Sequence, residues 1–493
     1  MKILFIYPNE MMLNPPPVSI GIFTAILKNA GFEVALFDTT YYQTSSTMSD
    51  KAKETNLQVR PFDYEEKNVS LEKTDLFGDL QNKIETFWPD LITISILEST
   101  YVQAISILDI IQHYKIPVVV GGVFPTFAPA QILSHLGVNF VCIGEGEGPL
   151  LELCMKMRNG EDISKIRNFW IRKGSHIIKN RIRLVVSLDN LPCPDYDLFE
   201  PKRFLRPMAG KIYRTVSVET NRGCIYSCAY CNSPSQSRLY REHKAGNFFR
   251  KKSMECIQKE LRRLINLHDA EYVYFPSDTF LSMTDREFKQ FIEIYSEFRL
   301  PFWIQTRVET ITKEKMLELK RVGCHRMSLG IEHGNFEFRK KVLKKNISNE
   351  AIIKACNIIA DVGIPLTVNN IIGFPDETRE LVFDTININR QLVFDTTNAY
   401  VFSPFHGTSL HRVCLEKGLI SKSQVTKNLT IDIALNMPQL PRSEVEGLRK
   451  TFALYTRLPK KYWPKIKKAE GNDKEAQNIF NELRSIYISK YFS

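Results

Sequence analysis

Three cysteines within eight residues have the clearest chemical potential in this sequence. Cys224, Cys228 and Cys231 are spaced CxxxCxxC in ETNRGCIYSCAYCNSP, and thiolates so arranged are typical ligands of iron-sulfur clusters or zinc. A cubane cluster held by three cysteines leaves one iron open, whereas structural zinc normally needs a fourth protein ligand. No further cysteine or histidine lies nearby, so the pattern favours a cluster. A zinc site completed by the distant His243 is the alternative.

The sequence around these cysteines predicts a repeated strand and helix pattern. The strand run RTVSVET directly precedes them, and apolar strand runs then alternate with amphipathic helices as far as AYVFSPF. Six such repeats predict a partial (β/α)6 barrel of the TIM type over residues 213–408. Because barrels of this kind carry their chemistry on the loops after the strands, the cysteines occupy a suitable position.

The first 160 residues predict a second α/β unit. KILFIY, EVALFD, LITISI, IPVVVGG and VNFVCIG are short runs separated by helical patterns, and most are apolar throughout, as in parallel strands covered on both faces. We therefore expect an N-terminal doubly wound, Rossmann-like sheet over residues 1–160, with ligand at the carboxyl ends of its strands. The polar stretch from Thr39 to Thr74 lacks apolar periodicity and predicts a long loop over that edge.

Two further segments complete the expected organisation. Residues 161–212 predict a small β piece, with Lys173-Gly174 in a hairpin position, followed by a proline-rich linker. Residues 409–493 predict a basic helical region that helps to close the site, with 12 Lys or Arg against 6 Asp or Glu from Pro441 onward. Basic runs interleaved with aromatic residues, such as Ser237 to Lys252, are usually solvated faces, so we do not expect nucleic-acid binding.

Composition limits the class of protein. The chain has 493 residues, which suggests about three domains, and 43% hydrophobic with 25% charged residues excludes disorder and a disulfide scaffold. No run of 18 apolar residues predicts a membrane span. The start MKILFIYPNE predicts a first strand and no signal peptide, so we expect a cytoplasmic protein. The net charge of +11 does not by itself identify a partner.

From Tyr213 to about Phe405 the chain resembles radical S-adenosylmethionine (SAM) enzymes, through the cysteine motif and the repeats after it. The resemblance implies a [4Fe-4S] cluster whose open iron is chelated by SAM. An electron from an external donor such as flavodoxin or ferredoxin then cleaves SAM to a 5'-deoxyadenosyl radical, which abstracts hydrogen from substrate. The protein positions and shields these reactive groups.

The same resemblance implies SAM contacts near the cysteines. Tyr230, beside the last cysteine, resembles the residue that touches adenine, with loop packing as the alternative. Asp278 in FPSDTF stands where relatives place polar groups toward the SAM amino group. The family often has two acids there, and Ser277 departs from that pattern. A cap or turn role is the alternative for Asp278.

Three later strand ends supply the remaining expected SAM contacts. Arg307 in WIQTRVE offers a cation for the SAM carboxylate or an anionic substrate, with a surface salt bridge as the alternative. Glu332 in SLGIEHG resembles the family's GIE sequence and is expected to bind ribose hydroxyls or the amino group. Gly373 in IIGFPDET allows close backbone approach, in a turn that we expect to support adenine.

The first 155 residues are similar to the cobalamin-binding domain that precedes the barrel in one large class of radical SAM proteins. VVVGGVFPTFAP and VCIGEGEGPLLEL carry glycines that admit a flat ligand, LITISILEST offers hydroxyls, and ordinary βα turns are the alternative. One departure is that PNEMMLNPPPVSIG lacks the cobalt-ligating histidine of DxHxxG domains. The expected cobalamin contacts are Ser95, Ser99, Gly121, Gly122, Gly144, Glu145 and Gly146.

These resemblances imply a radical SAM enzyme that acts on an unreactive carbon of its substrate. Cobalamin-dependent transfer of a methyl group to that carbon is the first expectation. A radical cyclase or rearrangement enzyme is an alternative. A methylthiotransferase is another, although Cys142, Cys154 and Cys193 do not form the second cysteine cluster of that group. A cofactor-free scaffold and a non-catalytic zinc and nucleic-acid binder are alternatives of another class. The expected substrate is a small molecule or peptide.

Overall fold

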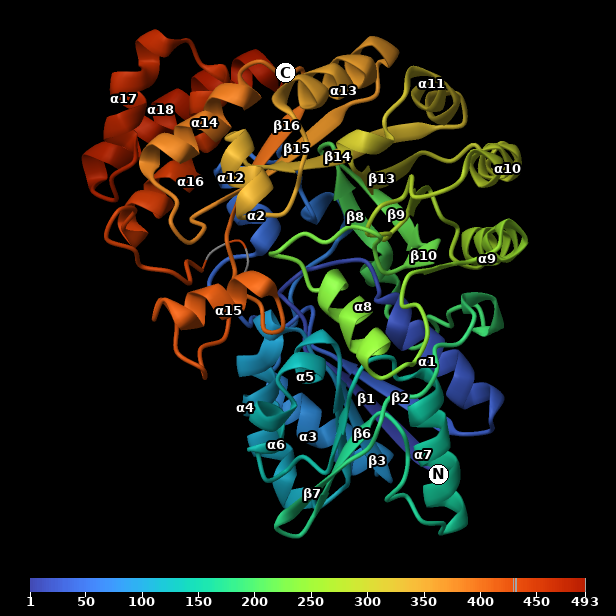
Figure 1. The fold of residues 1–493 in the computed structure, drawn as a ribbon. Helices are drawn as coiled ribbons and strands as arrows, with labels where there is room; N and C mark the ends of the chain where they lie inside the picture. The colour runs from blue at the N-terminus through green and yellow to red at the C-terminus, as the bar shows by residue number, and fades with distance from the viewer. Residues whose placement is uncertain (429, 431, 493) are drawn as a thin grey trace.

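The computed structural model describes residues 1–428, 430 and 432–492. Figure 1 shows two α/β units, the N-terminal one in blue to teal and the second in green to orange, with the red helices of the C-terminal region beside the second unit. Helix α8 (Ser233–Glu242) lies between the two units. The two sheets therefore present their loops to a common junction.

The N-terminal unit is built on a seven-stranded sheet in the order β2-β1-β3-β4-β5-β6-β7. Its first five strands are parallel, which confirms the predicted doubly wound sheet. Continuous apolar runs suit this position because helices cover both faces. The strands are β1 (Lys2–Tyr7), β2 (Glu33–Asp38), β3 (Leu91–Ser95), β4 (Val118–Gly121), β5 (Phe140–Cys142), β6 (Phe169–Lys173) and β7 (His176–Lys179). The helices are α1 (Val18–Asn29), α3 (Leu76–Phe87), α4 (Tyr101–Ile111), α5 (Val123–Phe127), α6 (Pro129–Leu133) and α7 (Glu147–Asn159).

The hairpin expected at Lys173-Gly174 is part of this first sheet. Strand β6 pairs antiparallel with β5, and β7 pairs antiparallel with β6. Gly174 has a φ of 59° in the connecting turn, a conformation that glycine adopts without strain. The hairpin, which the sequence places beside the linker, therefore extends the edge of the N-terminal sheet.

Residues 39–75, which we call the α2 excursion, leave the N-terminal unit and reach the second one. They include the helix α2 (Ser49–Thr55), although the sequence predicts a loop there. Gln58 Nε2 donates to the Ala399 carbonyl at 3.5 Å, and Arg60 pairs with Asp395 at 2.8 Å. The excursion therefore docks against β16 (Thr396–Val401), the last strand of the second sheet.

The second unit is a curled sheet in the order β16-β15-β14-β13-β12-β9-β8. Six strands, from β9 to β16, are parallel, which confirms the predicted partial barrel, and β8 pairs antiparallel at the edge. The further strands are β8 (Leu205–Met208), β9 (Lys211–Ser217), β10 (Asn221–Arg222), β11 (Arg250–Lys251), β12 (Tyr272–Tyr274), β13 (Phe302–Thr306), β14 (Cys324–Glu332) and β15 (Leu366–Ile372). The helices are α9 (Met254–Leu267), α10 (Asp285–Tyr295), α11 (Lys313–Arg321), α12 (Phe336–Lys341), α13 (Asn349–Val362), α14 (Arg379–Asn389) and α15 (Ser409–Glu416).

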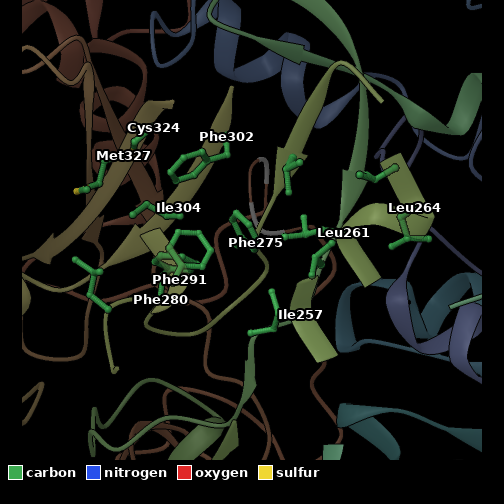
Figure 2. Close-up of a cluster of buried hydrophobic side chains, with 14 of the residues drawn as sticks. Ile257, Leu261, Leu264, Phe275, Phe280, Phe291, Phe302, Ile304, Cys324 and Met327 are labelled. Atoms are coloured by element: carbon green, nitrogen blue, oxygen red, sulfur yellow. The ribbon is translucent and has the colours of Figure 1, made fainter. Parts of the chain in front are cut away.

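The outer helices hold the half-barrel through a continuous aromatic and aliphatic core (Figure 2). Ile257, Leu261 and Leu264 of α9 recur at helical spacing and are fully buried. Phe275 and Phe291 meet edge-on, with ring centroids 5.6 Å apart. Burial of each such side chain contributes about 1.5–3 kcal/mol to the free energy of folding. The strands that end at the site are therefore anchored in a well-packed core.

The C-terminal region is helical, as predicted, with α16 (Arg442–Arg457), α17 (Trp463–Ala469) and α18 (Lys474–Tyr491). Helix α16 packs against β16 and α14 and covers the open edge of the curled sheet. None of the described residues of these three helices lines the cavities at the strand ends. The segment before them reaches the site instead, because Thr430 lines the cavity that holds the cysteines.

Candidate functional site

The three cysteines of the motif open onto one cavity of about 560 Å³ at the carboxyl edge of the half-barrel, which we call the cysteine cavity. His243 follows the last residue of α8, is exposed and does not line it. Among the described residues, no three His, Cys, Asp or Glu side chains converge closely enough to hold a single metal ion. The arrangement does not support the zinc alternative. Three thiols facing one cavity, without a fourth ligand, suit a cluster that leaves one iron open.

Arg307 is the charged neighbour of the cysteine sulfurs. Its Nη1 donates to Cys228 Sγ at 3.1 Å, its guanidinium pairs with Glu309 at 2.6 Å, and it lies 3.7 Å from the ring centroid of Tyr226. Arg307 therefore fixes the Cys228 side chain at the wall of the cavity. Burial raises the pKa of the Cys231 thiol to about 12, so loading with metal must release protons.

Two residues predicted to contact SAM lie beside the cysteines. Tyr230 and Asp278 both line the cysteine cavity, and the Tyr230 ring lies 6.2 Å from that of Phe374. Asp278 opens onto the cavity and pairs with no cation among the described residues. The surrounding protein desolvates its carboxyl group and raises the pKa. Such a carboxylate suits a cationic group of a ligand.

Glu332 is held in a strained conformation at the same cavity. Its φ is 66°, which is unusual for a residue other than glycine and recurs at functional sites. The pairing of β14 with β15 shifts register between Gly330 and Glu332, and a Cβ on Gly330 would lie 2.1 Å from Glu332 Oε1. Lys345, buried and 3.0 Å from the same oxygen, fixes the carboxylate. Lys345 cannot be recognised from the sequence, because nothing in VLKKNIS distinguishes it from a surface lysine.

Gly373 supports the site from outside the cavity. It is not among the residues that line the cysteine cavity, and a Cβ at its position would lie 3.3 Å from Val445 of α16. Its φ is 82°, and Phe374 N–H donates to Glu377 at 2.9 Å. Glu377 in turn lies 3.1 Å from buried His333. The turn is thus packed against α16 and does not itself line the cysteine cavity, so a contact between Gly373 and SAM stays a prediction.

The glycine-rich strand ends of the N-terminal sheet surround a second cavity of about 330 Å³, which we call the N-terminal cavity. Six of the seven residues predicted to contact cobalamin line it: Ser95, Gly121, Gly122, Gly144, Glu145 and Gly146. The seventh, Ser99, lines the neighbouring junction cavity. The N-terminal cavity reaches Phe5, Leu150 and Phe169, an apolar depth that suits an aromatic or aliphatic part of a ligand. None of its described lining residues is a histidine, which agrees with the absence of a cobalt-ligating DxHxxG histidine from the sequence.

Between the two cavities lies the junction cavity, which has a volume of about 490 Å³ and shares lining residues with both. The junction cavity shares with the N-terminal cavity Leu97, Val123, Glu219, Arg222, Gln236 and Phe248. It shares with the cysteine cavity Tyr230, Cys231, Asp278 and Phe405. One crevice therefore runs between the carboxyl ends of both sheets, where ligand was expected.

Arg222, two residues before Cys224, joins the two edges across this crevice. Its Nη1 lies 2.7 Å from both Glu145 and Glu147 of the N-terminal unit, and its Nη2 lies 3.1 Å from Glu219. Arg250 also pairs with Glu145. This network cannot be predicted from the sequence, because Arg222 and Glu147 are 75 residues apart.

Comparisons with known proteins agree with this architecture. Residues 218–387 match the Radical SAM superfamily, and residues 11–154 match the B12 binding domain. The chain is 26% identical over 394 residues to an uncharacterized methyltransferase of Pyrococcus horikoshii, covering 78% of this chain and 82% of that protein. It is 23% identical to the anaerobic magnesium-protoporphyrin IX monomethyl ester cyclase of Rubrivivax gelatinosus, covering 82% and 68%. The structure of the radical SAM methyltransferase TsrM from Kitasatospora setae, with cobalamin and a [4Fe-4S] cluster bound, has a TM-score of 0.66 at 15% identity, covering 98% and 99%.

The fold and the matches define an enzyme of the radical SAM class with a cobalamin-binding module. The chain carries a Radical SAM domain over residues 218–387 and a B12 binding domain over residues 11–154. The [4Fe-4S] cluster, SAM and cobalamin are therefore its cofactors, and it requires a reductant and a substrate. None of the helices in the part of the chain that the structure describes has the length and apolar character that a membrane span requires.

Proposed function

We propose that this enzyme transfers a methyl group to an unreactive carbon of its substrate. The observation that supports this most is the single crevice that joins the glycine-rich edge of the N-terminal sheet to the cysteines. The bound cofactors would supply a methyl group and a hydrogen-abstracting radical, and both must act on one enclosed substrate. Cys224, Cys228 and Cys231 would hold the cluster. Ser95, Gly121 and Gly144 would be among the residues that contact the corrin.

The remaining side chains would orient SAM and exclude water. Tyr230 would pack on adenine, Asp278 would accept from the amino group, and Glu332, fixed by Lys345, would bind ribose hydroxyls. Arg307 already contacts Cys228 and Glu309. We therefore propose that its main role is to position the cysteine loop and not to bind the SAM carboxylate. Water exclusion falls to the α2 excursion, which lines the cysteine cavity through Ser49 and Lys53.

A radical cyclase is the second candidate, since the chain is also similar to a magnesium-protoporphyrin ester cyclase. Cys142 is the one cysteine among the described residues that line the N-terminal cavity, whereas a second cluster of the methylthiotransferase kind needs three. The cysteines predicted to be scattered, Cys142 and Cys154, are buried in the core. We therefore propose methyl transfer first, with a small one-electron donor such as flavodoxin or ferredoxin, and a small molecule or peptide as substrate.

Anaerobic reconstitution tests this proposal. The full chain is loaded with iron, sulfide and cobalamin, reduced, and incubated with SAM. We expect about four iron atoms and one corrin per chain, and formation of both 5'-deoxyadenosine and S-adenosylhomocysteine. The second product reports methyl loss from SAM. Formation of 5'-deoxyadenosine alone in the corrin-loaded protein would favour the cyclase, and formation of neither would overturn the proposal.

A further inference from the structure

The cysteine cavity continues into the interior of the half-barrel. A lower cavity of about 220 Å³, which we call the lumen cavity, lies toward the amino ends of the strands. Both cavities are lined by Lys53, Gln305, Ser328, Asn369 and Tyr400. Trp303 lines only the lumen cavity and lies three residues before Thr306 of the cysteine cavity, which is about 10 Å along β13.

The α2 excursion and strand β8 close the open side of the half-barrel around the lumen cavity. Asp50, Lys53 and Val59 come from the excursion, while Arg206 and Pro207 come from β8. The chamber is thus completed by a segment of the N-terminal unit, and its walls are formed before any substrate enters.

Basic side chains exceed acidic ones at the lumen cavity. Lys53 lies 3.1 Å from Asp50, and Arg60 and Arg326 share Asp395. Arg206 has no ion pair among the described residues. It is the basic residue of this cavity whose charge no carboxylate of the described chain neutralises.

An aromatic platform positions the Arg206 guanidinium. Its Cζ lies 4.6 Å from the ring centroid of Tyr274 and 4.9 Å from that of Trp303. These two rings stack 4.7 Å apart, and Trp303 Nε1 donates to Ser328 Oγ at 2.9 Å. Arg206 Nη1 is buried and has no hydrogen-bond partner. The two rings thus cover one face of the guanidinium, while Nη1 at its edge still has no hydrogen-bond acceptor.

Asn398 provides a second unsatisfied group in the same cavity. Asn398 is only 6% exposed, and its Nδ2 donates to Asn369 Oδ1 at 2.8 Å. Its Oδ1 is buried and has no hydrogen-bond partner. Because buried polar atoms are normally paired, both groups point to a ligand that is anionic at one position and donates a hydrogen bond at another.

We propose that Arg206 binds an anionic group of the substrate, a carboxylate or a phosphate, while Asn398 Oδ1 accepts a hydrogen bond from the substrate. The substrate would extend upward past Gln305 and Asn369 and present the reacting carbon about 10 Å away, near the cysteine cavity. This inference rests on the proposed function, because it takes the half-barrel interior as the substrate chamber.

Binding of small anions tests the proposal without turnover. The full chain in low-salt buffer is titrated with inorganic phosphate, followed by phosphorus NMR line broadening, and separately with carbon-13 acetate. We expect saturable binding of at least one anion at one site per chain. Arg206→Gln should weaken it by about 10-fold or more, and Arg206→Lys by about threefold at most. Stronger binding of phosphate would indicate a phosphorylated substrate, and stronger binding of acetate a carboxylated one.

Two further variants keep the result decisive. Asn398→Asp has nearly the same size and places a negative charge beside the site, so it should weaken anion binding even if Arg206→Gln does not fold. Arg321→Gln, at an exposed arginine of α11, should bind as the wild type does. Absence of saturable binding, or equal binding by Arg206→Gln or Asn398→Asp, would overturn the inference. Cleavage of SAM without anion binding would contradict this inference alone, and anion binding without SAM cleavage would contradict only the proposed function.

Discussion

The two strand-end edges that face each other across the crevice are built from different kinds of group. The N-terminal edge presents glycines and a deep apolar wall, with Gly121, Gly122 and Gly144 at the strand ends. The half-barrel edge presents thiols and carboxylates on strand-end loops, including Cys228 and Asp278. The first edge is suited to a ligand recognised by shape and backbone contact, and the second to ligands held by specific atoms. Removal of a single side chain should therefore abolish the function of the half-barrel edge. The N-terminal edge should lose its ligand only when a larger side chain occupies the space beside its glycines.

Loss of one cysteine should have the largest effect. We expect Cys228→Ala to lower iron content and formation of 5'-deoxyadenosine by about 100-fold or more, because a cubane needs all three protein ligands. Cobalamin binding should persist, since Cys228 does not line the N-terminal cavity. Cys256→Ser, a partly buried thiol away from the cysteine motif, is the matched control. Retention of a full iron complement by Cys228→Ala would contradict the assignment of the cluster to this motif.

Filling the N-terminal edge should abolish the other half of the function. A Cβ at Gly121 would lie no closer than 3.5 Å to Cys142, so Gly121→Val should fold, and its methyl groups should occupy space needed by the corrin. We expect cobalamin affinity to fall by about 10-fold or more, measured by equilibrium dialysis, with iron content unchanged. Gly78→Ala on α3 is the control. Unchanged cobalamin affinity in Gly121→Val would show that the corrin lies elsewhere.

Removal of Arg222 should separate the two edges. Arg222→Gln would remove the positive charge that pairs with Glu145, Glu147 and Glu219. These three carboxylates would then lie close together in a mostly buried position. Breaking such a network costs about 3 kcal/mol of unfolding free energy, measured by denaturant titration. The exposed pair of Arg262 and Glu297 is the control, and Arg262→Gln should cost less than about 1 kcal/mol. Equal stability of the two variants would mean that Arg222 does not hold the units together.

The same contrast explains what the sequence predicts and what it does not. The doubly wound sheet, the six parallel strands of the half-barrel and the cysteine motif are predictable because each depends on local periodicity or on spacing within a few residues. The docking of the α2 excursion depends on contacts such as Gln58 with Ala399, 341 residues apart, and no local pattern encodes it.

Functional side chains on the half-barrel are only partly predictable for the same reason. Glu332 follows a recognisable strand-end sequence, but its partner Lys345 and its positive φ appear only in the folded chain. Arg206 lies in a segment expected to be a linker, and its aromatic platform comes from two other strands. Side chains that act through tertiary neighbours carry no signal in sequence spacing.

The smallest expected effect concerns pH at the junction, where His411 lies 4.3 Å from the ring of His406. Burial, followed by the charge of His406, lowers the pKa of His411 to about 4 in the folded chain, despite nearby Glu98. Unfolded histidine has a pKa of about 6.5, so the unfolded state binds more protons between these values and stability falls as pH decreases from 6.5 to 4. We expect His411→Gln to reduce this fall in Tm by about 1–3 °C, measured calorimetrically, whereas His113→Gln, at an exposed histidine, should leave it unchanged. An identical pH dependence in His411→Gln and wild type would show that another group controls acid stability at the junction.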